Sequence, residues 1–197
     1  INKRKFLEFE MKGKKYVIGV DFGTLSARAV LVDTANGAEL SSATAEYKHG
    51  VLDEVLYVNG AKLPDSYALQ DPDDYVDALI SVVSKVVKDS NVDKNDIVGL
   101  GIDFTSCTVL PVDKNFIPLC KKTEFRQNPH AWVKLWKHHG AQKYADKMTE
   151  VAREKNQEFL PRLGNTVSSE SALPKLWETM QEAPTVYEAT EYFLEAG

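Results

Sequence analysis

The chain has 197 residues and a mass of 22.0 kDa, with 43% hydrophobic and 27% charged residues. This composition is typical of a globular protein and excludes a disordered or low-complexity chain. The 24 basic and 29 acidic residues give a net charge of −5, which argues against a non-specific nucleic-acid binder, because such proteins collect phosphates with a basic surface.

The cysteines and the apolar runs of the sequence indicate the cellular compartment of the protein. Cys107 and Cys120 are too few for a disulfide framework and lack metal-ligand spacing. The longest apolar stretches, such as residues 97–102, are too short to span a membrane. Residues 1–10 do not form an export signal, and we interpret them as a tag remnant or an alternative start before Met11. We therefore predict a reducing, cytoplasmic setting, with neither nucleic acid nor a membrane as partner.

The N-terminal part predicts a sheet. Residues 16–20, 26–33 and 38–48 form three strand-like runs separated by short turns, which predicts an antiparallel meander. The polar stretch 49–70 contains apolar islands and a turn at Asn59-Gly60, and this pattern predicts a hairpin insertion.

A helix is expected directly after the hairpin. Asp71 is a capping residue, Pro72 suits the first helical position, and acidic residues follow in the first turn. An apolar stripe at helical spacing predicts that one face packs on a sheet; it comprises Tyr75, Leu79, Val82, Val83, Val86 and Val87. Residues 97–102 then predict another buried strand.

The C-terminal part is expected to be mainly helical. A strand over 109–112 and a turn near 116–118 precede four predicted helices, over residues 129–139, 141–155, 173–181 and 184–196, the last capped by Gly197. This order predicts an α/β domain with a mixed sheet flanked by helices. Because an α/β unit usually adds another strand after its last helix, we interpret the sequence as truncated at its C-terminal end.

The turn that follows the first strand carries the first candidate site. Gly23 lets the backbone approach a ligand closely, and the N–H groups of the turn, with nearby hydroxyls, suit phosphate oxygens. Asp21 at the strand end is a candidate ligand of Mg²⁺, and Arg28 would neutralise phosphate charge. A hairpin with a polar tip is the alternative interpretation.

A second strand end, residues 103–108, is rich in small hydroxyl residues. Open α/β sheets bind ligands outside the carboxyl ends of their strands. The alternative is a simple turn that leads into Val109. Because Asp21 and Asp103 both stand at strand ends, they indicate one shared site.

The third candidate segment, residues 125–139, holds three of the four histidines and two of the three tryptophans. Trp132 and Trp136 share one face of the expected helix, which ordinarily means core packing. His138 and His139 are adjacent and would point in different directions, so a helical zinc site is not supported. Polyol recognition is more attractive, with an aromatic wall against the carbon skeleton and hydroxyls bonded by Arg126, Asn128, Lys137 or His138.

Residues 17–24, with Ser26 and Arg28, resemble the first phosphate motif of the sugar-kinase/Hsp70/actin superfamily. Within it, the chain is similar to the carbohydrate kinases of the FGGY type. The likeness covers about residues 16–197.

Other segments narrow the likeness to the L-ribulokinases within that family. They are residues 99–108 and 129–139, with Leu135-Trp136-Lys137-His138-His139 as the most specific part, and further on Ser168-Ser169-Glu170 and Pro174-Lys175-Leu176-Trp177.

The resemblance implies a ribonuclease H-like fold, with residues 11–197 as the first lobe of a two-lobed sugar kinase. It implies ATP-dependent phosphorylation of L-ribulose to L-ribulose 5-phosphate, a step of L-arabinose catabolism, with ATP and Mg²⁺. The general-base Asp and the adenosine motif are expected beyond Gly197, so this chain alone is expected to be inactive.

The resemblance also assigns roles to residues of this chain. Asp21 would hold the metal. The ATP phosphates would contact Gly23, Thr24, Leu25, Ser26 and Arg28. The sugar would contact Thr105, Ser106, Cys107, Trp132, Lys137 and His138.

Three alternatives stay open. The closest is a kinase for another pentulose or polyol, such as xylulose, ribitol or glycerol. A nuclease on the same scaffold would use Asp21 and Asp103 as two-metal ligands. A non-catalytic binding module of the actin-like class is the third. A homodimer is also left open.

Overall fold

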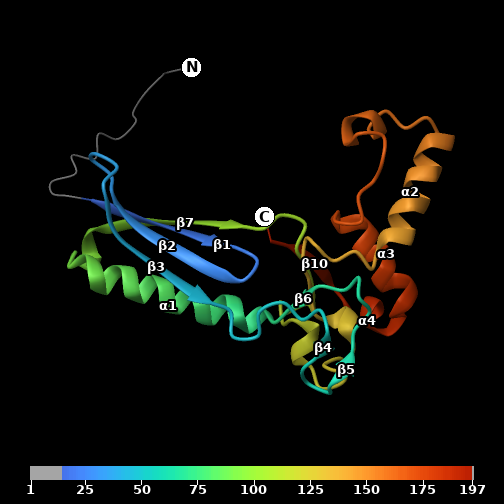
Figure 1. Cartoon of the computed structure of the whole chain (residues 1–197), viewed down its shortest axis with the longest axis horizontal. Coiled ribbons are helices and arrows are strands. Elements are labelled where there is room, and N and C mark those ends of the chain that lie inside the picture. The colour runs from blue at the N-terminus through green and yellow to red at the C-terminus, as the bar shows by residue number, and fades with distance from the viewer. Residues whose placement is uncertain (1–14, 197) are drawn as a thin grey trace.

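The computed structural model describes residues 15–196, and these residues form two parts (Figure 1). An elongated sheet with helix α1 lies at one end, and a cluster of short strands and helices α2 to α4 lies at the other. The predicted leader, residues 1–10, and the predicted cap Gly197 lie outside the described residues. No helix within residues 15–196 is both long enough and apolar enough to cross a bilayer.

The main sheet has four strands in the order β3-β2-β1-β7. The predicted antiparallel meander is confirmed as β1 (Tyr16–Phe22), β2 (Ser26–Asp33) and β3 (Glu39–Glu46). The fourth strand, β7 (Ile97–Phe104), pairs with β1 in parallel, so the sheet is mixed as expected.

Helix α1 (Pro72–Ser90) begins and ends as the sequence predicts. The Asp71 carboxylate accepts a hydrogen bond from the Asp73 N–H at 3.0 Å, which caps the first turn. Asn91, with φ of 55°, ends the helix in the left-handed conformation. The helix packs mainly on β2 and β3. Its stripe faces the sheet: Val82 and Val86 are buried, and Tyr75, Leu79, Val83 and Val87 are partly buried against the same core.

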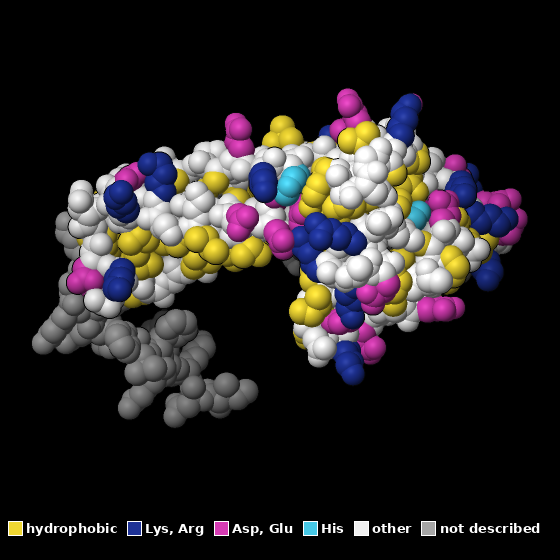
Figure 2. Space-filling model, turned by 90° about the horizontal axis from the view of Figure 1, so that it is seen from below, with side chains coloured by type: hydrophobic (Ala, Val, Ile, Leu, Met, Phe, Trp, Pro, Cys, Tyr) yellow, Lys and Arg dark blue, Asp and Glu magenta, His cyan; other side chains and the backbone are white. Residues whose placement is uncertain are grey.

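Strand β7 exists as predicted, but the expectation that it is buried is wrong. It is an edge strand, and α1 lies over β2 and β3 rather than over it. Val98, Leu100 and Ile102 are therefore 54%, 47% and 52% exposed. Hydrophobic side chains are visible along this half of the molecule (Figure 2). The apolar run of residues 97–102 therefore predicted the strand correctly but its burial incorrectly.

The second part contains a hairpin and a small sheet. The predicted hairpin is confirmed, with β4 (Val55–Leu56) and β5 (Ala61–Lys62) joined through Asn59-Gly60. The small sheet has the order β10-β8-β9-β6, and its pairs are antiparallel. Its strands are β6 (Leu69–Gln70), β8 (Val109–Val112), β9 (Val133–Lys134) and β10 (Tyr192–Glu195).

Two of the four predicted C-terminal helices are confirmed, as α2 (Gln142–Glu154) and α3 (Ala172–Glu182). The prediction of a helix over 184–196 is only half right. Helix α4 (Pro184–Ala189) ends early, and the aromatic residues that follow form β10 because they pair with β8. Short 3-10 helices occupy Lys94–Asp96, Leu119–Lys121, Pro129–Ala131 and Leu160–Leu163.

The predicted helix over 129–139 is wrong. The Asn128 side chain accepts a hydrogen bond from the His130 N–H at 2.9 Å and caps a single 3-10 turn. The chain then extends as β9, where Val133 pairs with Gln70. Tertiary pairing with β6 therefore overrides the local helical pattern.

We expect Asp71→Ala to destabilise the protein. Asp71 is 1% exposed and also accepts hydrogen bonds from the Tyr57 hydroxyl at 2.6 Å and the Lys121 ammonium at 2.7 Å. Losing the cap costs about 1 kcal/mol, and two unpaired donors add about 1–3 kcal/mol. The melting temperature, measured by circular dichroism, should fall by about 4–16 °C. Asp73→Ala is the matched control, because Asp73 is exposed and Lys121 keeps its bond to Asp71. An equal effect of both substitutions would contradict the capping role.

The same interaction sets a pH dependence. Burial alone would raise the pKa of Asp71, but hydrogen bonds from Lys121, Tyr57 and the Asp73 N–H outweigh burial and lower it. The ionised carboxylate of Asp71 stabilises the fold fully above its unfolded-state pKa of about 4. This stabilisation is lost as the pH falls through its lower folded-state pKa. The wild-type and Asp71→Ala melting temperatures should therefore converge in acid.

Candidate functional site

The parallel register of β1 and β7 brings two carboxylates together. Asp21 pairs with Asp103 on adjacent strands, which lie about 4.8 Å apart in a sheet. Both residues line a groove of 590 Å³ on the main sheet. The Arg28 guanidinium donates a hydrogen bond to the Asp21 carboxylate. The structure thus brings Asp21, Asp103 and Arg28 to one place.

Three carbonyl groups of the turn between β1 and β2 accept hydrogen bonds that fix the turn to the rest of the fold. The Gly23 carbonyl accepts from the Tyr47 hydroxyl at 3.0 Å, the Thr24 carbonyl from the Gln70 amide at 2.7 Å, and the Leu25 carbonyl from the Tyr47 N–H at 2.9 Å. In a trans peptide the N–H points opposite to the carbonyl. The N–H groups of Thr24 and Leu25 therefore point away from these partners, and within residues 15–196 neither N–H donates a hydrogen bond.

This turn fits a phosphate group, since outward N–H groups form an anion-binding concavity. A side chain at position 23 would place its Cβ 3.3 Å from the Ser26 carbonyl oxygen, a tight contact that glycine avoids. Leu25 is 61% exposed, and Ser26 begins β2 beside the turn. The predicted phosphate residues therefore lie together.

The two carboxylates suit Mg²⁺, which takes only part of its ligands from the protein. They do not suit a metal ion whose ligands all come from protein side chains. Within residues 15–196 no group of three or more His, Cys, Asp or Glu side chains is placed to hold a metal ion. Mg²⁺ needs only one or two carboxylates when phosphate oxygens and water supply its other ligands. Asp21 and Asp103 offer those two.

A pocket of 240 Å³ lies at the carboxyl end of β7. Its lining comprises Thr105, Ser106, Cys107, Trp136 and Glu170. The Trp136 indole N–H donates to the Thr24 hydroxyl at 3.1 Å. The pocket and the turn between β1 and β2 are therefore directly connected.

Cys107 has an unusual backbone in this pocket. Its φ is 60°, a left-handed conformation that few non-glycine residues adopt. Its N–H donates to the Glu195 carboxylate, and its carbonyl accepts from the Lys175 ammonium at 2.6 Å. The Thr105 and Thr108 hydroxyls are hydrogen-bonded at 3.0 Å. The loop after β7 is thus held from both sides.

Three predicted sugar contacts lie away from this pocket. Trp132 is 1% exposed in the core, and its indole N–H donates to the Arg126 carbonyl at 3.0 Å. His138 is completely buried, and the Lys137 ammonium lies 3.9 Å from the Asp53 carboxylate. A direct contact with a sugar requires an exposed atom, which neither Trp132 nor His138 offers. Trp136 and Glu170 line the pocket instead. Neither is among the sugar contacts that the sequence analysis assigned, although the family resemblance at residues 135–139 and 168–170 includes both.

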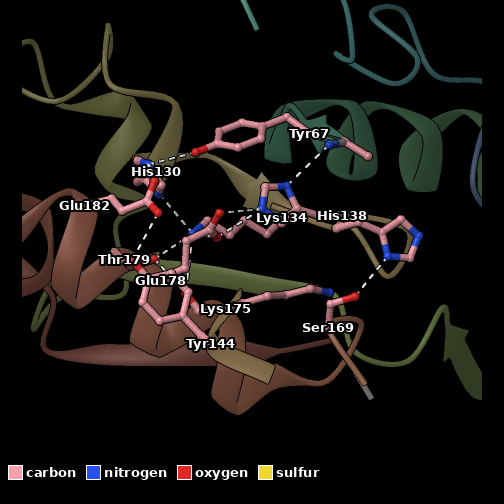
Figure 3. A network of polar contacts seen from close by, with 12 residues as sticks. Tyr67, His130, Lys134, His138, Tyr144, Ser169, Lys175, Glu178, Thr179 and Glu182 are labelled. Atoms are coloured by element: carbon pink, nitrogen blue, oxygen red, sulfur yellow. Dashed lines mark hydrogen bonds and ion pairs between the residues drawn. The ribbon is translucent and has the colours of Figure 1, made fainter. Parts of the chain in front are cut away.

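A network of buried charges joins the segment around β9 to α3 (Figure 3). The Lys134 ammonium donates to the Glu178 carboxylate at 2.6 Å, the Thr179 hydroxyl at 2.7 Å and His130 Nδ1 at 3.0 Å. Because lysine only donates, His130 Nδ1 accepts and Nε2 carries the proton. His138 Nδ1 accepts from the Ala68 N–H, so His138 Nε2 donates to Glu178.

The charge states of this network follow from burial and pairing. Burial, assisted by the Lys134 charge, lowers the pKa of His130 to about 4, and burial also lowers the pKa of His138. Burial alone would raise the pKa of Glu178, but the hydrogen bond from His138 and the Lys134 charge lower it to about 2. Two neutral histidines and one carboxylate therefore surround Lys134 at neutral pH.

A comparison with protein families decides the family. The model of the N-terminal domain of the FGGY family of carbohydrate kinases matches residues 16–196. The chain belongs to this family.

Curated relatives point to one branch of the FGGY family. The chain is 50% identical over 184 residues to a ribulokinase of Geobacillus thermodenitrificans, and 50% identical over 182 residues to a ribulokinase of Halalkalibacterium halodurans. The matches cover 93% and 92% of this chain and 32% of each relative. The chain thus spans about a third of the length of these relatives.

Solved structures agree on the fold. Xylulose kinase from Rhodospirillum rubrum has a TM-score of 0.65 at 18% identity, and gluconate kinase from Lactobacillus acidophilus has a TM-score of 0.68 at 16% identity. Each match covers 92% of this chain, and 32% and 31% of the two structures respectively. The expected fold class, an α/β domain of the actin/Hsp70/sugar-kinase type, is confirmed.

We expect Trp132→Ala to act on stability. Truncating a buried aromatic side chain costs about 3–5 kcal/mol, which corresponds to a fall of about 6–20 °C in melting temperature. Trp136→Ala is the matched control, because Trp136 is 37% exposed and should cost much less. Calorimetry of the two variants measures the difference. Equal melting temperatures would contradict the placement of Trp132 in the core.

Proposed function

We propose that this chain is the first lobe of an ATP-dependent kinase that converts L-ribulose to L-ribulose 5-phosphate. The observation that carries the proposal is the connection of the turn after β1 to the pocket after β7 through the Trp136–Thr24 hydrogen bond. It sets a phosphate-binding turn beside a small polar pocket. The ribulokinase relatives favour L-ribulose as the sugar.

The turn and the carboxylates would act on the ATP phosphates. Phosphoryl transfer depends on positioning and charge neutralisation. The N–H groups of Thr24 and Leu25, with the Ser26 hydroxyl, would bind phosphate oxygens. Arg28 would leave its pairing with Asp21 to neutralise phosphate charge, which frees the Asp21 carboxylate for Mg²⁺. Mg²⁺ held there would neutralise part of the phosphate charge.

The pocket after β7 would bind the sugar. Its Thr105 and Ser106 hydroxyls and the second lone pair of the Cys107 carbonyl offer hydrogen-bonding groups, and the Glu170 carboxylate is a further acceptor. The Trp136 indole provides an apolar face for the carbon skeleton. A few placed polar groups on an apolar wall are typical of a small-molecule site. The attacking sugar hydroxyl must lose a proton, and the Asp that would accept it is expected beyond Gly197.

The alternatives differ in support. A kinase for another pentulose or polyol would use the same turn and differ only in the pocket. The nuclease alternative is disfavoured, because the chain is acidic and belongs to a carbohydrate kinase family. A reducing cytoplasmic setting, the absence of nucleic-acid and membrane partners, and a homodimer remain predictions.

An ADP-release assay on the intact protein, with a panel of pentuloses, pentitols and glycerol, tests the proposal. A clear preference for L-ribulose supports it. A preference for another sugar overturns the choice of substrate and keeps the kinase. No turnover with any sugar would overturn the kinase and favour the non-catalytic alternative.

We expect Asp21→Asn to lower kcat of the intact enzyme at least about a hundredfold, because a neutral amide is a poor ligand for Mg²⁺. The melting temperature should stay within about 2 °C, because surface ion pairs such as Asp21–Arg28 contribute little to stability. Asp89→Asn, at the exposed end of α1, is the control and should retain activity. Near-normal turnover of the Asp21 variant would exclude the metal role.

A further inference from the structure

Lys175 is a buried cation without a carboxylate partner. It lies on α3, is 0% exposed, and forms no ion pair with any described residue. Its ammonium donates to the Cys107 carbonyl at 2.6 Å and the Leu135 carbonyl at 2.8 Å, and it lies 3.5 Å from the Trp136 carbonyl. Lys134, the other buried lysine of this region, instead pairs with Glu178 (Figure 3).

The carbonyls that Lys175 binds belong to two separate segments of the pocket. Cys107 follows β7 and Trp136 follows β9, and both line the pocket. Within residues 15–196 no other side chain donates hydrogen bonds to both segments. The ammonium therefore acts as the one polar link between them.

The Cys107 backbone has a particular need for this link. A left-handed conformation costs a non-glycine residue free energy and persists only where its surroundings hold it. Lys175 binds the Cys107 carbonyl, and Glu195 accepts from its N–H. Without the ammonium, the carbonyl would be free to turn, and the pocket wall would change shape.

We propose that Lys175 is a positioning residue of the sugar pocket. Its ammonium fixes the Cys107 backbone relative to Trp136, so that both meet the sugar in one geometry. This inference rests on the proposed function in one respect: it assumes that the ligand of the pocket is the sugar.

The titration of Lys175 supports this role. Burial lowers the pKa of Lys175 to about 8. The titratable groups that face it are Cys107 on the loop after β7, Lys134 on β9, Glu170 before α3 and Glu178 on α3; Lys134 lowers the pKa of Lys175 further and the other three raise it. Deprotonation above about pH 8 leaves a neutral amine, which donates fewer and weaker hydrogen bonds to the carbonyls.

The test is Lys175→Met in the intact enzyme. We expect the KM for L-ribulose to rise about tenfold, while kcat and the KM for ATP change by less than about threefold, because a lost charge-assisted hydrogen bond costs enough for a tenfold effect. Lys134→Met is the matched control: it removes an equally buried lysine whose ammonium bonds to the Lys175 carbonyl but to no atom of either pocket segment, so it should lower the melting temperature without raising the sugar KM. An unchanged sugar KM in Lys175→Met overturns the proposal, as does an equal rise in both variants.

Two further measurements keep the inference testable if Lys175→Met does not fold, or if L-ribulose is not the substrate. In the wild-type enzyme the sugar KM should rise above about pH 8 while the KM for ATP stays constant, and a sugar KM that does not change with pH overturns the proposal.

Amide hydrogen exchange at residues 105–108 and 135–137 needs no substrate. It should quicken in Lys175→Ala and slow again on addition of ethylammonium, and unchanged exchange overturns the link. Failure of the wild-type enzyme to phosphorylate L-ribulose would count against the proposed function alone.

Discussion

The parallel pairing of β1 with β7 is the constraint on which the candidate site depends. Its register sets Asp21 opposite Asp103 and, two residues earlier on the same face, Gly19 opposite Gly101. Because two facing glycines carry no side chains, the sheet stays bare next to the two carboxylates, and the groove opens there. A shift of β7 by one residue against β1 would turn the Asp103 carboxylate to the opposite face of the sheet, away from Asp21 and the groove.

Local signals in the sequence were sufficient for the first half of the fold. Alternating runs, tight turns and the Asp71-Pro72 start predict the meander and α1, and strand ends predict where Asp21 and Asp103 meet. Residues 129–139 show the limit of such signals. Their helical spacing of apolar residues is real, but pairing with β6 draws Val133 and Lys134 into a strand, and this tertiary gain is not visible locally. Trp132 then turns into the core and Trp136 to the pocket.

The buried charges could not be read from the sequence for a related reason. Lys134, His138 and Glu178 are polar residues of types that are seldom fully buried, and burying any one of them without a partner costs free energy. They become acceptable only because β9 and α3 bring them within hydrogen-bonding distance. Gly140 belongs to the same arrangement, since a Cβ there would lie 2.7 Å from His138 Nε2 and collide with the network. The attraction between such charges is largely offset by the cost of removing them from water, so the cluster is weak evidence for added stability.

The outer edge of β7 has a consequence for how this segment behaves by itself. Within residues 15–196 that edge pairs with no strand, and it carries Val98, Leu100 and Ile102 without a proline or lysine between them. An open strand of this kind is a template for the edge of another molecule. Concentrated preparations of the isolated segment are therefore expected to self-associate through β7, and a charged substitution at position 100 is the direct way to keep them monomeric.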